Sequence, residues 1–201
     1  MRERTPPIWV VVLIKGFQVA KQRLSPALDP AARERLARQN AGLALAAARA
    51  GDSVLAVCAN QEAAELARLA GAETLLESQP QGQNPAARRG IEHAVRRGAG
   101  AVLVLSSDLP LVNRRAVAGM IAFSRRLPLP AAVAAPAVGR GGTNALYLAP
   151  PDALQLHFGD GSLAKFEADA RRQGVEFRLY RSPALALDLD EPADLAALEA
   201  V

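Results

Sequence analysis

Short, continuous apolar runs alternate along the chain with longer segments of helical pattern. Unbroken apolar runs are typical of strands that are buried on both faces of a parallel sheet. The longer segments carry helix-start signals, such as Asp29 followed by Pro30, and helix-end signals, such as Gly51. Strands that alternate with helices in this way indicate βαβ units, so the pattern predicts an α/β fold with a mostly parallel central sheet.

The pattern also gives approximate boundaries for each element. The predicted strands span residues 8–14, 53–59, 73–77, 101–106, 131–136, 144–148 and 176–181. The predicted helices span residues 29–50, 61–70, 85–97, 113–126, 162–173 and 192–200. Ligands of such sheets bind beyond the carboxyl ends of the strands, so we expect the functional residues in the segments that follow strands.

Composition narrows the class of protein. Half of the 201 residues are hydrophobic, which excludes a disordered chain and suits a single domain over residues 1–201. The one cysteine, Cys58, and the two histidines exclude an intrachain disulfide and a Cys/His metal cluster, and they fit a reducing cytoplasm. The apolar run 8–14 is too short to span a membrane, so we expect a cytoplasmic protein with no membrane partner.

The charge of the chain indicates an anionic ligand. The net charge is +4 and the sequence pI is about 9.8, which an arginine-rich surface also explains. No stripe of aromatic residues interleaves the basic residues, so a nucleic-acid partner is not expected. Two of the three lysines, Lys15 and Lys21, fall in one segment after the first strand, although the chain otherwise uses arginine.

That segment is a candidate phosphate-binding loop. Lys15, Lys21 and Arg23 lie in it close to Gly16. A triphosphate needs several positive charges and close approach of the backbone, and this loop offers both. The loop is neither a Walker A motif nor a G-x-G-x-x-G motif, and a solvated surface loop explains its charges equally well.

Carboxylates that follow strands are candidate metal ligands. Asp108 follows the apolar run 101–106, and Mg²⁺ prefers carboxylate oxygen together with substrate phosphate. Asp188 and Asp190 alternate at a predicted strand end, which puts their side chains on one side, where they could complete the site with Asp108. The alternatives are a helix cap for Asp108 and an acidic first helical turn for the other two.

The segment between the predicted strands 131–136 and 144–148 is a candidate anion site. Arg140 and Thr143 flank a glycine pair that permits close approach of an anion, and a plain hairpin turn is the alternative. Asn84, which precedes Pro85, is predicted to cap the helix 85–97, with a substrate contact at the helix start as the second interpretation.

A second candidate anion site opens the predicted helix 162–173. Gly159 and Gly161 flank Asp160, and Ser162 begins the helix. The free N–H groups at a helix start suit a small anion. A simple cap by Asp160 or Ser162 explains the same residues.

Together these segments resemble one family, the 2-phospholactate and phosphoenolpyruvate guanylyltransferases of coenzyme F-420 biosynthesis. The resemblance covers nearly the whole chain. Its most specific marks are Gly142-Thr143-Asn144-Ala145-Leu146 and Phe158-Gly159-Asp160-Gly161-Ser162, supported by Ala20-Lys21-Gln22-Arg23-Leu24, Ser107-Asp108-Leu109-Pro110-Leu111 and Leu187-Asp188-Leu189-Asp190-Glu191-Pro192.

The resemblance implies a three-layer, Rossmann-like GT-A fold, GTP as co-substrate and Mg²⁺. It implies attack of an acceptor phosphate on the α-phosphorus of GTP, with release of pyrophosphate. The expected catalytic residues are Lys15, Lys21 and Arg23 at the triphosphate and Asp108 at the metal, with Asp188 or Asp190. The expected acceptor-binding residues are Thr143, Gly159 and Ser162, with Asn84 and Arg140 beside them.

Other functions stay open at this point. A molybdopterin or sugar phosphate could be the acceptor, because nucleotidyltransferases of the same fold share the Asp-Leu-Pro element. An inactive nucleotide-binding homologue is the second alternative, because Val138–Gly141 differs from the acidic residues of the family. The expected partners are small-molecule substrates, and the sequence is compatible with a homodimer without fixing the oligomeric state.

Overall fold

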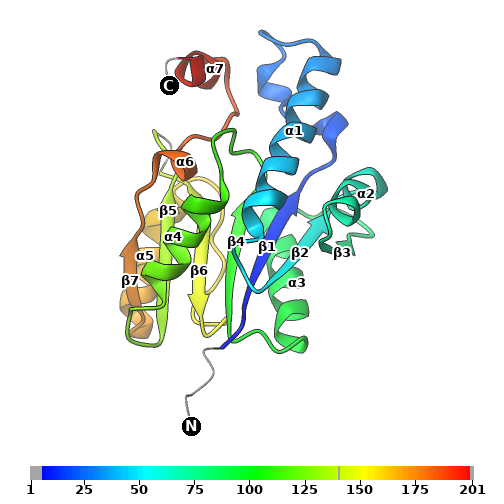
Figure 1. Ribbon diagram of the computed structural model, residues 1–201. Coiled ribbons are helices and arrows are strands. Elements are labelled where there is room, and N and C mark those ends of the chain that lie inside the picture. The colour runs from blue at the N-terminus through cyan, green and yellow to red at the C-terminus, as the bar shows by residue number, and fades with distance from the viewer. Residues whose placement is uncertain (1–5, 140, 200–201) are drawn as a thin grey trace.

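The computed structural model describes residues 6–139 and 141–199, which form a seven-stranded sheet with helices on both faces (Figure 1). The strand order is β3-β2-β1-β4-β6-β5-β7. Strands β1 to β4 run parallel to one another, β6 is antiparallel to both β4 and β5, and β7 is parallel to β5. The prediction of a mostly parallel α/β fold is therefore confirmed.

Most element boundaries agree with the sequence pattern to within a few residues. The strands are β1 (Ile8–Ile14), β2 (Ser53–Cys58), β3 (Glu73–Leu76), β4 (Ala101–Ser106), β5 (Ala131–Pro136), β6 (Thr143–Ala149) and β7 (Glu176–Leu179). The helices are α1 (Pro30–Ala48), α2 (Gln61–Leu69), α3 (Gln83–Arg96), α4 (Arg114–Ser124), α5 (Ser162–Gln173), α6 (Pro183–Ala186) and α7 (Pro192–Glu199). No helix within the described residues is long and apolar enough to cross a membrane.

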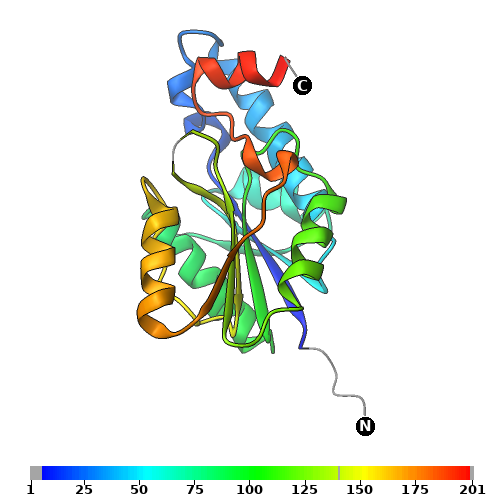
Figure 2. The same ribbon diagram turned by 90° about the vertical axis from the view of Figure 1, so that its left-hand side faces the viewer.

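The sheet separates two hydrophobic clusters. Helices α1, α2 and α4 cover one face, and α3 and α5 cover the other (Figure 2). Along β1, Val10 and Val12 belong to the first cluster, while Val11 and Leu13 belong to the second. Because successive side chains of a strand point to opposite faces, the continuous apolar run of β1 serves both layers at once.

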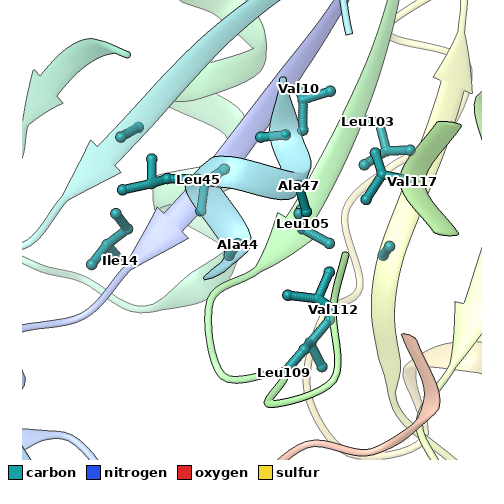
Figure 3. Close-up of a cluster of buried hydrophobic side chains, with 14 of the residues drawn as sticks. Val10, Ile14, Ala44, Leu45, Ala47, Leu103, Leu105, Leu109, Val112 and Val117 are labelled. Carbon is teal, nitrogen blue, oxygen red and sulfur yellow. The ribbon is translucent and has the colours of Figure 1, made fainter. Parts of the chain in front are cut away.

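Small side chains let α1 approach the sheet closely. Ala44, Leu45 and Ala47 are almost fully buried and face Val10 and Leu105 of the central strands (Figure 3). A core that has few aromatic residues must fill its volume by such close approach, because protein interiors are packed as densely as organic crystals.

Polar side chains cap three helix starts, of which the Asp29 cap was predicted from the sequence. The side chain of Asp29 accepts a hydrogen bond from the backbone N–H of Ala32 at 2.7 Å, and Asn113 accepts one from Ala116 at 3.0 Å. Asn60 caps α2 in the same way. These caps satisfy N–H groups that have no partner inside the helix.

The structure corrects two of the predicted elements. Helix α3 begins at Gln83 with Gly82 as its N-cap (φ 101°), so Asn84 lies inside the helix and is not the cap. The segment 187–190 before α7 has no regular secondary structure, so the strand expected there is absent, and the short helix α6 precedes the segment. Two short 3₁₀ helices after β1, η1 (Phe17–Val19) and η2 (Gln22–Leu24), were not predicted.

The sheet order determines where a ligand can bind. β1 pairs with β2 on one side and with β4 on the other, so the chain connections diverge at the carboxyl end of β1. Such a switch point is where open α/β sheets bind ligands. Because β6 runs antiparallel to β4, its first residue, Thr143, lies at the same edge.

Two glycines in helices provide a test of this packing. A Cβ atom on Gly90 of α3 would lie 2.5 Å from Cγ1 of Val11 and 2.9 Å from Cγ2 of Val57, whereas a Cβ atom on Gly42 of α1 would meet nothing within 4 Å. Gly90→Ala should therefore lower the free energy of unfolding by about 1–3 kcal/mol through overpacking. Gly42→Ala should raise it by about 0.5–1 kcal/mol through helix propensity alone.

Chemical denaturation of both variants measures the two effects. Equal stabilisation of the two variants would show that α3 does not pack on β1 and β2 as closely as described.

Candidate functional site

A cavity of about 340 Å³ opens at the carboxyl ends of the central strands. This volume lies within the range of small-molecule sites in proteins. The cavity brings together most of the residues that the sequence singled out, namely Lys15, Lys21, Arg23, Asp108, Thr143, Gly159, Asp188 and Asp190. These residues come from widely separated parts of the chain, so their convergence supports the choice of this edge as the functional site.

Lys21 is the buried positive charge of the cavity. Only 4% of its side chain is exposed, and its Nζ donates a hydrogen bond of 2.5 Å to the backbone carbonyl of Leu189. The same ammonium lies 3.7 Å from Oδ2 of Asp108 and 3.8 Å from Oδ1 of Asp190. The backbone of Lys21 is left-handed (φ 60°), which costs an L-residue roughly 1–2 kcal/mol. Backbone strain of this kind concentrates at functional sites.

Asp108 is held by donors on several sides. The hydroxyl of Ser106 donates to its Oδ1 at 2.6 Å. Burial alone raises the pKa of the Asp108 carboxyl, but the charge of Lys21, the Ser106 hydrogen bond and the charge of Lys15 outweigh it and lower the pKa overall. Asp108 is therefore ionised at neutral pH, as a metal ligand must be.

The C-terminal segment contributes two further carboxylates. Asp188 and Asp190 both line the cavity, while Leu189 between them is fully buried. The predicted alternation is thus present, although the segment is extended coil rather than a strand. The backbone N–H of Leu189 donates to the backbone carbonyl of Asp108 at 3.2 Å, which docks this segment beside the end of β4.

The carboxylates fit a Mg²⁺ ion whose remaining ligands come from substrate phosphate and water. Within residues 6–139 and 141–199 there is no group of three or more His, Cys, Asp or Glu side chains that could hold a metal alone. Mg²⁺ commonly uses only one or two carboxylates and takes its other ligands from phosphate and water. Asp108 and Asp190 already share one cation, the ammonium of Lys21, which shows that this position favours positive charge.

Thr143 and Ser162 lie in contact, as expected, but only Thr143 lines the cavity. The hydroxyl of Ser162 donates to Oγ1 of Thr143 at 3.0 Å. Thr143 lines the cavity, whereas Ser162 is fully buried behind it. Since the Thr143 oxygen accepts from Ser162, its own proton is left to donate toward the cavity.

The start of α5 is less open than the sequence suggested. The backbone N–H of Ser162 donates to the carbonyl of Gly159, and that of Leu163 donates to the carbonyl of Gly141, both at 3.1 Å. The expectation of free N–H groups is therefore wrong for these two residues. The glycine turn closes on itself and on the neighbouring loop, which local spacing does not reveal.

Asn84 acts on the loop that precedes α5. Its amide nitrogen donates to the carbonyl of Phe158 at 2.9 Å, and its amide oxygen accepts from the Phe158 N–H at 2.8 Å. This pair of bonds fixes the chain just before Gly159, whose φ of 118° and place on the cavity wall depend on that turn. The structure thus places Asn84 as a positioning residue for this loop.

The remaining predicted residues lie at the rim or outside the described part. Lys15 is exposed at the end of β1 and lines the cavity. The Arg23 side chain is 70% exposed and lies 3.7 Å from the carboxylate of Glu191. Arg140 lies outside the described residues.

Sequence reasoning missed two polar residues of this region. Glu77 is buried and lines the cavity directly after β3, the same strand-end signal that singled out Asp108. Asn144, in the Gly-Thr-Asn element, donates from its amide to the carbonyls of Leu185 and Ala186 and so anchors α6. Its role requires a partner distant in sequence, which no local pattern shows.

Comparison with known proteins identifies the family. Residues 8–199 match the family described as guanylyl transferase CofC like. The chain belongs to the CofC-like guanylyl transferase family. It is accordingly a nucleotidyltransferase, as the resemblance implied.

Several curated relatives are similar over almost their whole length. The phosphoenolpyruvate guanylyltransferase of Rubrobacter xylanophilus is 40% identical over 96% of this chain and 94% of its own. The 2-phospho-L-lactate guanylyltransferase of Methanothermobacter thermautotrophicus is 32% identical over 94% of this chain and 82% of its own. The 3-phospho-D-glycerate guanylyltransferase of Phenylobacterium zucineum is 32% identical over 92% and 86%.

Solved structures agree on the fold. A nucleotidyl transferase from Methanothermobacter has a TM-score of 0.64 at 15% identity and covers 96% of this chain and 95% of its own. The Rv0371c protein of Mycobacterium tuberculosis, in complex with manganese, has a TM-score of 0.60 at 19% identity over 97% and 100%. The expectation of a nucleotidyltransferase fold is confirmed.

The buried Lys21 contact predicts a specific loss of stability. Lys21→Met removes the hydrogen bond to the Leu189 carbonyl and the cation beside Asp108. A hydrogen bond to a charged group usually contributes about 1.5–3 kcal/mol, so the free energy of unfolding should fall by roughly that amount. Lys165→Met is the matched control, since Lys165 also donates to a backbone carbonyl, that of Asp160, but is exposed. Thermal and chemical denaturation compare the two.

The same variant tests the cause of the lowered Asp108 pKa. A carboxyl whose pKa is lowered on folding adds stability above its ordinary value of 3.8, and this stability disappears as the pH falls through the folded-state pKa. Lys21→Met should therefore lose less stability than the wild type on acidification below about pH 4. Parallel acid profiles for the two proteins would contradict the assignment.

Proposed function

We propose that this protein transfers GMP from GTP to the phosphate of a three-carbon phospho-acid, with release of pyrophosphate, in coenzyme F-420 biosynthesis. Phosphoenolpyruvate is the favoured acceptor, because the relative at 40% identity carries its name. 2-Phospholactate and 3-phosphoglycerate are chemically close, since each has one phosphate and one carboxylate on three carbons. The observation that supports this proposal most is that one cavity is lined by Lys21, Asp108 and Thr143.

The reaction is an in-line displacement at phosphorus. An oxygen of the acceptor phosphate attacks the α-phosphorus of GTP, and the bond from the α-phosphorus to the bridging oxygen of pyrophosphate breaks. This chemistry needs positioning and positive charge rather than a protein nucleophile. Lys15 at the end of β1 and Lys21 behind it supply fixed positive charge at the phosphates.

Asp108, with Asp188 or Asp190, would hold Mg²⁺ in this scheme. The ion supplies charge neutralisation at the phosphates when bound. Support comes from the lowered pKa of Asp108 and from the cation that it already shares with Asp190. Lys21 keeps these carboxylates at fixed positions through its bond to the Leu189 carbonyl.

The other end of the cavity is assigned to the acceptor. Thr143 presents a hydroxyl whose oxygen is already fixed by Ser162, so it meets an anion with little further loss of freedom. Gly159 has no side chain to separate its backbone from a ligand. Such preorganised donors orient the acceptor phosphate toward the α-phosphorus.

A direct assay tests the proposal. The protein is incubated with GTP, Mg²⁺ and each of the three acceptors in turn, and the products are identified by mass spectrometry. The expected result is a guanylylated acceptor, formed faster from GTP than from ATP or CTP, and no product after chelation of the metal. Absence of product with all three acceptors would exclude this function and favour a different acceptor or an inactive homologue.

Two hydroxyl variants separate the acceptor contact from its support. Thr143→Val should raise the acceptor KM about tenfold or more, since a hydrogen bond to a charged group contributes about 1.5–3 kcal/mol. Ser162→Ala should raise the acceptor KM less, and should also lower stability by about 1 kcal/mol. The KM for GTP should change little in both.

Ser124→Ala is the matched control for Ser162. The Ser124 hydroxyl is equally buried and donates to the Met120 carbonyl at 2.8 Å within α4, outside the cavity lining. It should lose similar stability without any change in acceptor KM. If Ser162→Ala behaves like Ser124→Ala, Ser162 has no role in positioning Thr143 for the acceptor.

A further inference from the structure

Glu77 is a polar group of the cavity that the mechanism above does not use. It follows β3 directly, and its backbone N–H donates to the carbonyl of Cys58 at 2.9 Å, which fixes its position beside β2. The residue is only 8% exposed and lines the cavity. Glu77 is therefore a carboxylate held at the ligand edge, on the far side of β2 from Lys15.

The Glu77 carboxylate is poorly compensated by the protein. Burial raises its pKa, and the charge of Arg89 opposes this shift only in part. Among the described residues, no side chain or backbone group makes a hydrogen bond or an ion pair with this carboxylate. The two carboxylate oxygens are not fully enclosed by the protein, so they can accept hydrogen bonds from a ligand. The structural surroundings alone thus give no reason for a carboxylate at this position, whereas a ligand with N–H donors would.

The neighbouring residues describe the shape of that ligand. Leu13, Val57 and Ala86 give the cavity apolar surface, against which the faces of a flat ring can pack. Pro80 and Gly82 follow Glu77 closely in sequence and line the cavity as well. These residues favour an aromatic heterocycle that presents N–H groups along one edge.

The distance from the phosphate residues is also suitable. β2 lies between β3 and β1, and neighbouring strands are about 4.8 Å apart, so roughly 10 Å separates the ends of β3 and β1. This is comparable with the distance from the pairing edge of a purine, across the ribose, to its α-phosphate. A nucleotide whose phosphates lie at Lys15 and Lys21 can therefore reach Glu77 with its base.

We propose that the Glu77 carboxylate selects guanine by accepting hydrogen bonds from its N1–H and its 2-amino group. Two adjacent donors match the two oxygens of one carboxylate, and hydrogen bonds to an ionised acceptor are stronger than neutral ones. Adenine has an acceptor at N1 and would face the carboxylate with a lone pair. The inference rests on the proposed use of GTP and adds the residue that would make the site specific for it.

Exchange of the carboxylate for an amide gives a test with a gain of function. Xanthine keeps the N1–H donor of guanine but has a carbonyl in place of the 2-amino group. The amide of Glu77→Gln can accept from N1–H and donate to that carbonyl. We expect kcat/KM for GTP to fall at least tenfold and the ratio of xanthosine to guanosine triphosphate use to rise at least tenfold. Inosine triphosphate lacks the 2-amino group, so the wild type should use it less well than GTP. The Glu77→Gln variant should not show this preference for GTP over inosine triphosphate.

Two controls separate specificity from stability. Glu73→Gln changes a carboxylate of the same strand that pairs with His93 at 2.7 Å and does not line the cavity, so it should leave the nucleotide preference unchanged. Glu77→Asp keeps the carboxylate but shortens the side chain by one methylene group, which moves the charge away from the base. GTP use should therefore fall without a gain for xanthosine triphosphate. The melting temperature of Glu77→Gln should equal or exceed that of the wild type, because burial of the residue disfavours the charged carboxylate.

Calorimetric titration with GTP, without acceptor, gives a readout that is independent of turnover. An unchanged preference for GTP over xanthosine triphosphate in Glu77→Gln, with or without a lower melting temperature, would overturn the role of Glu77 alone. A wild-type protein that binds and uses another nucleotide better than GTP would overturn both this inference and the proposed function.

Discussion

The arrangement of the site depends on one buried ammonium group. Lys21 lies between η1 and η2 in a left-handed backbone conformation, and its Nζ lies near Asp108, Asp190 and the carbonyl of Leu189. A charge in this position needs nearby partners, because removal from water is costly unless the charge is compensated. The partners come from the end of β4 and from the C-terminal segment. These three contacts of one ammonium join parts of the chain that are far apart in sequence, and they hold the acidic residues beside the segment that carries Lys15 and Lys21.

Amide side chains extend the same principle to the loops around the cavity. Asn84 binds both backbone polar groups of Phe158, and Asn144 binds two carbonyls at α6. Loop backbone cannot use helix or sheet hydrogen bonds, so its buried polar groups need such partners. Each amide lies at the start of a rigid element, Asn84 in α3 and Asn144 in β6, so these bonds fix the loops relative to the sheet. Preorganisation of this kind is what transfer between two bound phosphates requires.

The sequence pattern predicted the framework well because it depends on local signals. Continuous apolar runs located β1, β4 and β5 with their observed limits, and side-chain caps such as Asp29 marked helix starts. The errors share one cause. Asn84 has the chemistry of a cap but binds a partner 74 residues away, and the first N–H groups of α5 bind loops that spacing cannot place. Glu77 carried the same strand-end signal as Asp108, but its burial and its place on the cavity wall exist only in the folded chain.

Asp108 and Glu77 show how the same strand-end position yields opposite electrostatics. Both carboxylates follow a parallel strand and lie at the cavity, and burial acts on both in the same direction. Asp108 has an ammonium and a hydroxyl beside it, so its pKa is lowered and the carboxyl is ionised at neutral pH. Burial raises the pKa of Glu77, the charge of Arg89 opposes this shift only in part, and no described residue donates a hydrogen bond to the carboxylate. In a nucleotidyltransferase the first condition suits a ligand for a cation, which must be ionised before the substrate arrives. The second suits base recognition, because an uncompensated acceptor gains most from a ligand that supplies N–H groups and is penalised most by one that does not.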